Sequence, residues 1–136
     1  MTKVLVLHSV SLVRSALAAL LRCEGGFEVT SAGWRTAAHQ AESFRPGVAV
    51  VDLDRPGASA TLGAGAGTGS ASRLPESSPP LLVLATPGAP GSLRRGVQAE
   101  ARGYVDKDGS PGRLVRAVRK VELGMRAEGR RSSADR

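Results

Sequence analysis

Short apolar runs alternate with helical patterns along this chain of 136 residues, and this alternation limits the fold more than any other feature. Most of the runs are apolar at successive positions, as expected for strands that are covered on both faces. The predicted strands are residues 3–7, 27–30, 48–52, 81–85 and 103–105. The predicted helices are residues 11–23, 34–44, 92–101 and 111–124. The pattern predicts an α/β fold with a doubly wound, five-stranded parallel sheet and helices on both of its faces.

One segment departs from this alternation. Residues 57–80 contain five Gly, five Ala, five Ser and three Pro, with Leu62 and Leu74 as the only large apolar side chains. Glycine is about 1 kcal/mol less favourable than alanine in a helix, and little apolar surface is available here to offset that cost. We therefore expect the third helix to be degenerate or disordered, with at most one short helix near 58–64.

The net charge of +7 is concentrated at the end of the chain. Residues 1–112 carry 11 basic and 9 acidic side chains, whereas residues 113–136 carry 8 basic and 3 acidic ones. Gly124 is expected to stop the last helix. We therefore divide the chain into a folded domain at 1–125 and a basic linker or tail at 126–136.

Cysteine content and hydropathy exclude several classes of protein. Cys23 is the only cysteine, so the chain holds neither an internal disulfide nor a four-cysteine zinc site. We expect Cys23 to be buried at the end of the first helix. The apolar start is too short for a signal peptide and no run approaches membrane length, so we expect a cytoplasmic protein without membrane contact.

Two charged residues follow predicted strands. Asp52 ends the third strand, and Lys107 follows the fifth. Because the carboxyl ends of parallel strands lie at one edge of a sheet, these two side chains are expected to meet where open α/β folds bind ligands. The first strand is followed by His8 and Ser9, so no acid there joins Asp52 in holding a metal.

Five such β/α units, with an acid after the third strand and a lysine after the fifth, resemble the receiver domain of bacterial response regulators, in the NarL/LuxR-type branch. The stretches that carry the resemblance are residues 51–57, 81–84, 103–108 and 114–118. The resemblance implies a flavodoxin-like (βα)5 topology. It also implies that Asp52 stands at the position phosphorylated by a histidine kinase and that Lys107 holds the phosphoryl oxygens. Tyr104 matches an aromatic residue that changes rotamer on activation.

Other positions of that site differ from the family pattern. The acidic pair that holds Mg²⁺ falls on His8 and Ser9, and the Thr or Ser position falls on Ala85, next to Thr86. Asp54 adds a negative charge near Asp52 without restoring the matched pair. Since Mg²⁺ is usually anchored by carboxylates, we expect its site to be lost and no cofactor to be needed. We interpret Asp52 and Lys107 as a structural ion pair, and His8 as a histidine at the rim that tunes the local charge.

These features favour a regulatory domain over an enzyme. The leading hypothesis is an atypical receiver that controls transcription independently of Asp52 phosphorylation, through dimerisation, a small-molecule signal, or a linked or partner helix-turn-helix domain outside this chain. A weak homodimer is expected through the first and last helices. The alternative is a receiver phosphorylated at Asp52, in which Asp54 and Thr86 replace part of the missing site. A flavodoxin-like or nucleotide-binding enzyme ranks last, because the chain has no phosphate-cradling motif.

Overall fold

The computed structural model describes residues 2–52, 79–86, 94 and 100–134, with side chains described up to residue 124. The strands are β1 (Lys3–Leu7), β2 (Glu28–Ala32), β3 (Val48–Val51), β4 (Leu81–Ala85) and β5 (Gly103–Asp106). The helices are α1 (Ser11–Gly25), the short 3₁₀ helix η1 (Trp34–Thr36), α2 (Ala37–Phe44) and α5 (Pro111–Ala134). Most of the expected helix at 92–101, the segment at 57–78 and Asp54 lie outside the described residues.

All five strands pair in parallel in one sheet, in the order β2-β1-β3-β4-β5. Every residue of β3 and β4 is buried, and so is β1 after Lys3, because these strands are apolar on both faces and lie inside the sheet. The edge strand β5 instead alternates between half-buried and exposed residues. The predicted doubly wound parallel sheet is therefore confirmed, including its five strands.

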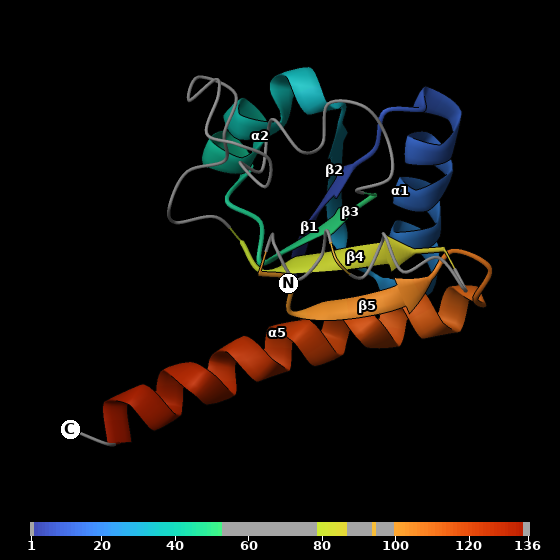
Figure 1. Cartoon of the computed structure of the whole chain (residues 1–136). Coiled ribbons are helices and arrows are strands. Elements are labelled where there is room, and N and C mark those ends of the chain that lie inside the picture. The colour runs from blue at the N-terminus through green and yellow to red at the C-terminus, as the bar shows by residue number, and fades with distance from the viewer. Residues whose placement is uncertain (1, 53–78, 87–93, 95–99, 135–136) are drawn as a thin grey trace.

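Alternate residues of the strands face two separate apolar layers, as the two-residue period of a strand requires. One layer packs β-strand side chains such as Val6, Val50 and Leu82 against α1 and α5. The other packs Leu5, Ala49 and neighbouring residues against η1 and α2. Figure 1 shows α2 on one side of the sheet and α5 on the other.

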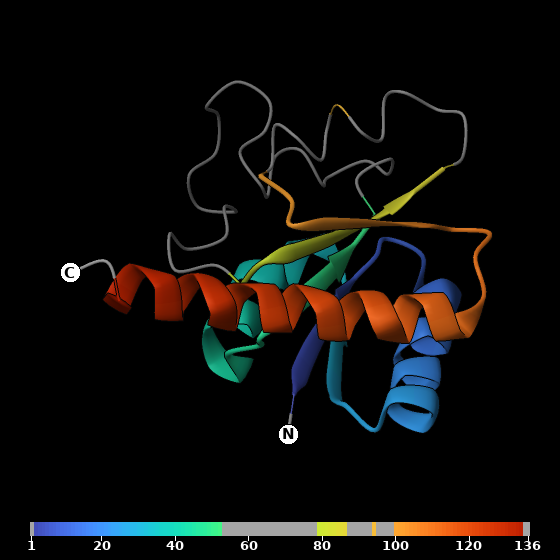
Figure 2. The same cartoon turned by 90° about the horizontal axis from the view of Figure 1, so that it is seen from below.

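The helix α5 is longer than predicted. The expected stop at Gly124 is wrong, since the helix continues to Ala134 and includes most of the stretch that was expected to be a linker or tail. A glycine inside a helix costs only about 1 kcal/mol, and the residues that follow, Met125 to Glu128, are good helix formers. In Figures 1 and 2 the end of α5 extends past the sheet.

The position of Cys23 was also predicted wrongly, because its side chain is exposed. The buried face of α1 is defined by Ala18 and Leu21. Each helical residue turns by about 100°, so a residue two positions after Leu21 points away from the core. The helix ends at Gly25, two residues beyond its predicted end: Gly26 takes a left-handed conformation (φ 66°), and its N–H donates to the carbonyl of Arg22.

In the parts of the chain that the structure describes, no helix has the length and hydropathy needed to cross a membrane.

Candidate functional site

The carboxyl ends of the central strands bring three functional side chains together. In the sheet register Leu7 lies beside Val51, and Ala85 lies beside Asp106. The residues that follow these strands keep the same alignment, because Asp52 N–H donates to Leu7 O over 3.4 Å and Lys107 N–H donates to Ala85 O over 2.9 Å. His8, Asp52 and Lys107 therefore meet at one edge of the sheet.

Asp52 lies at the centre of this site. Its Oδ2 atom is 3.1 Å from Lys107 Nζ and 3.1 Å from His8 Nε2. Asp52 is 1% exposed and His8 is 3% exposed, whereas 29% of the Lys107 side chain is exposed. One carboxylate oxygen thus has contacts with both an ammonium and an imidazole in a region largely removed from water. A buried charge needs such partners, because its desolvation is otherwise costly.

The second ring nitrogen of His8 identifies the tautomer. The backbone N–H of Val10 points at His8 Nδ1 over 3.0 Å. A backbone amide can only donate, so Nδ1 accepts and the ring proton lies on Nε2. Nε2–H then donates to Asp52 Oδ2, and the imidazole is neutral in this arrangement. His8 is held further by Arg14 of α1, whose Nη1 donates to the His8 carbonyl over 2.8 Å.

His8 therefore differs from the expected histidine at the rim: it is buried and contacts the aspartate directly. The sequence contained a signal for this contact. His8 directly follows β1, and in this topology β1 is the neighbour of β3, which ends beside Asp52. The strand order was needed to use that signal.

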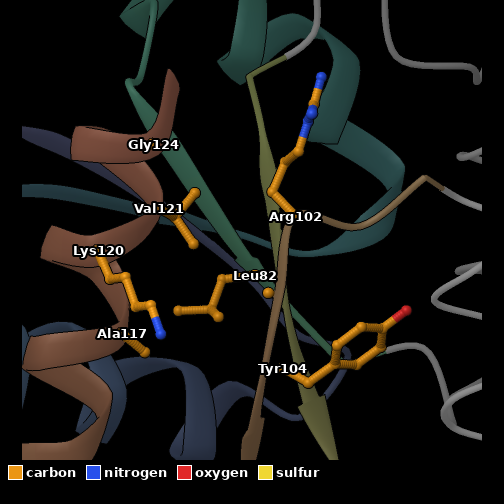
Figure 3. A pocket seen from close by; sticks show the side chains of 8 residues that line it. Leu82, Arg102, Tyr104, Ala117, Lys120, Val121 and Gly124 are labelled. Atoms are coloured by element: carbon orange, nitrogen blue, oxygen red, sulfur yellow. The ribbon is translucent and has the colours of Figure 1, made fainter. Parts of the chain in front are cut away.

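The other predicted site positions are more dispersed. Ala85 is buried at the end of β4, while Ser9 and Thr86 are exposed. Asp54 lies outside the described residues. Tyr104 is partly exposed on β5. Figure 3 shows its ring pointing away from a hollow of about 350 Å³ between β5 and α5, toward which Leu82 and Lys120 extend.

The residues at the site fit Mg²⁺ poorly. Mg²⁺ prefers oxygen ligands in near-octahedral geometry, but the position beside Asp52 is taken by an imidazole that directs an N–H at the carboxylate. Within the described residues, no group of three or more His, Cys, Asp or Glu side chains is arranged to hold a metal ion. The loss of the Mg²⁺ site remains a prediction.

Two curated proteins that are similar to this chain are both named as regulators. No family model matches the chain. It is 35% identical over 128 residues to the response regulator RamR of Streptomyces coelicolor, covering 93% of this chain and 60% of RamR. It is 28% identical over 130 residues to the transcriptional regulatory protein DesR of Bacillus subtilis, covering 93% of this chain and 61% of DesR. The chain thus spans about three fifths of the length of these curated relatives.

Solved structures agree on the fold. A DNA-binding response regulator of the LuxR family from Staphylococcus aureus superposes with a TM-score of 0.67 at 21% identity, covering 90% of this chain and 99% of that one. The predicted receiver topology is therefore confirmed. The chain is thus similar in sequence to response regulators, and its fold matches that of solved response regulator structures.

Proposed function

We propose that this chain is the receiver domain of a transcription regulator in the NarL/LuxR branch, and that its output does not depend on phosphorylation of Asp52. The observation that carries the proposal is the contact of Asp52 Oδ2 with both His8 Nε2 and Lys107 Nζ, each over 3.1 Å. DesR is named as a transcriptional regulatory protein, and the LuxR-family relative is named as DNA-binding. These names support a regulatory role, exerted through a linked or partner DNA-binding domain.

The chemistry of the site supports independence from phosphorylation. Phosphoryl transfer needs positive charge, usually from a metal together with a cationic side chain, on the oxygens of the transferred group. Here a neutral imidazole takes a place beside the acceptor carboxylate, and the carboxylate is almost fully buried. Asp52 is therefore poorly accessible to a phosphodonor, and it already balances the charge of Lys107.

The test is incubation with acetyl phosphate and Mg²⁺, followed by intact mass measurement. We expect no gain of a phosphoryl group in the wild-type chain. The matched variant is His8→Asp, which supplies a second carboxylate beside Asp52 and is expected to bind Mg²⁺ more tightly. A phosphoryl gain in the wild-type chain that disappears in Asp52→Asn would contradict the proposal.

A second candidate function is a receiver phosphorylated at Asp52. The retained contact between Asp52 and Lys107 favours it, because a lysine at this position can also hold phosphoryl oxygens. The two candidates differ in the behaviour of Asp52→Asn in a longer form that binds its promoter. The first predicts nearly unchanged promoter affinity, and the second predicts loss of the response in a variant that remains folded.

A further inference from the structure

A hollow of about 290 Å³ opens beside Asp52, between α1, α5 and the ends of β4 and β5. Its polar end is formed by His8, Asp52 and Lys107. Apolar side chains form its walls: Val13, Leu17, Leu20, Leu84, Val105 and Leu114. Small-molecule sites typically combine such apolar walls with a few convergent polar groups, in volumes that begin at about 300 Å³. The hollow therefore has the size and the lining of a site for a small ligand.

The arrangement of two helices explains why the hollow exists. α1 and α5 cross steeply in both views of the molecule (Figures 1 and 2). They are joined near the end of α1, where Arg119 Nη2 donates to Gly25 O over 3.3 Å. Leu21 and Val118 are fully buried between the helices and the sheet. Helices that cross steeply diverge away from their point of contact, and the hollow lies where these two diverge.

The divergence leaves part of the apolar face of α1 with little cover. Leu17 and Leu20 are only half-buried, and Val13 is 39% exposed. These three residues follow the helical spacing of the face that holds the fully buried Leu21. An apolar molecule in the hollow would remove their exposed surface from water, which is favourable in proportion to the apolar area covered.

The charges that line the hollow restrict the class of ligand. Asp52 and Asp106 contribute two carboxylates, against one ammonium from Lys107. An anion would approach Asp52 in a region with little water to screen the repulsion. Transfer of a cation from water into an apolar hollow is also costly. An uncharged molecule avoids both penalties, and the partly exposed Lys107 ammonium can donate to an acceptor atom on it.

We propose that this hollow binds an uncharged, mainly apolar small molecule with one hydrogen-bond acceptor, and that this ligand is the signal of the domain. The inference rests on the proposed function, because it supplies an input other than phosphorylation. A bound molecule touches α1 through Val13 and Leu17 and the start of α5 through Leu114. It therefore sets the position of the start of α5 relative to α1. α5 is also the helix that extends beyond the sheet (Figure 2).

The experiment uses 1-naphthol as the probe and follows backbone amides of the whole chain in ¹H–¹⁵N correlation spectra. We expect saturable shifts at residues that line the hollow, such as Val13, Leu17 and Val105. The anion 1-naphthoate has the same rings and is expected to bind at least about tenfold more weakly.

Two neighbouring residues of α1 provide matched variants. Val13 lines the hollow, whereas Leu12 is 84% exposed and does not. Val13→Asp and Leu12→Asp add the same charge to the same turn of the helix, at positions exposed enough for both variants to fold. We expect Val13→Asp to weaken 1-naphthol binding about tenfold and Leu12→Asp to change it less than about twofold.

Several results would overturn the proposal. These are the absence of saturable shifts in the folded chain, shifts confined to other residues, equal binding by the two variants, and equal binding of 1-naphthoate. Shifts of the same amides on dilution without the probe would identify a second copy of the chain as the occupant and would also overturn it. A negative result for 1-naphthol binding would not change the outcome of the acetyl phosphate test. Phosphorylation of Asp52 would likewise not change the outcome of the binding test, so the two proposals can fail separately.

Discussion

His8 is the residue of the candidate site that departs most from the receiver pattern that the sequence resembles. Both of its ring nitrogens are engaged, with Nδ1 accepting from Val10 N–H and Nε2 donating to Asp52. The side chain therefore connects the start of α1 to the end of β3. It supplies one hydrogen-bond donor at a position beside the carboxylate, where the resemblance to receivers implies that an acid would help to hold a metal.

We predict that His8→Ala destabilises the chain by about 1–3 kcal/mol, because it leaves a buried carboxylate and a partly buried backbone N–H without these contacts. Urea unfolding measures the effect. The only other histidine, His39, is exposed on α2 and serves as the control. His39→Ala should change the free energy of unfolding by less than about 0.5 kcal/mol. Equal effects of the two substitutions would show that the His8 contacts contribute nothing to stability.

The tautomer of His8 can be tested separately. We predict that ¹⁵N-detected imidazole spectra at neutral pH show the proton of His8 on Nε2, since Val10 N–H occupies Nδ1. In Asp52→Ala the acceptor for this proton is removed while the Val10 contact remains. A proton found on Nδ1 in the wild-type chain would contradict the arrangement.

At the scale of elements, two helical glycines have opposite environments. Gly25 is at the end of α1, and a Cβ atom there would lie 2.4 Å from Cε2 of Phe27. The Phe27 ring is buried in the core, and the Arg119 guanidinium lies over it at 5.6 Å. Gly124 is inside α5, and a Cβ atom there would have no described residue other than its own helical neighbours within 4 Å.

We therefore predict opposite signs for the same substitution. Gly25→Ala should lower the free energy of unfolding by about 1–3 kcal/mol, because the core must shift to accept the methyl group. Gly124→Ala should raise it by about 0.5–1 kcal/mol, because alanine is the better helix former and loses less entropy on folding. Thermal and urea unfolding of both variants measure these changes. A stabilised Gly25→Ala variant would mean that the Phe27 ring moves to accept the methyl group at little energetic cost.

At the scale of the whole molecule, the outer faces of α1 and α5 differ in character. Leu12, Ala16 and Ala19 form an exposed stripe without charge on α1. α5 exposes Arg113, Arg116 and Lys120, and the whole chain carries a net charge of +7. Two copies that meet through these helices would gain apolar contact but would repel each other through their basic side chains.

We predict a weak homodimer that becomes stronger as salt is raised, because ions screen the repulsion between like charges beyond about 10 Å at 0.1 M. Sedimentation equilibrium at several salt concentrations measures it. Arg116→Glu on α5 should change the salt dependence, while Arg35→Glu, exposed on η1 away from both helices, should not. A monomer at every concentration and salt level would exclude this dimer.

The sequence by itself determined the succession of strands and helices along the chain, the parallel sheet and the contact between Asp52 and Lys107. These features follow from local periodicity and from the rule that parallel strands end at one edge, so they need no knowledge of how the helices pack. The tertiary structure alone decided that His8 is buried against Asp52, that Cys23 is exposed and that a hollow separates α1 from α5. Each of these depends on strand order, helix rotation or crossing geometry. Such properties come from the packing of elements far apart in the chain, and a one-residue difference in helix phase is enough to reverse them.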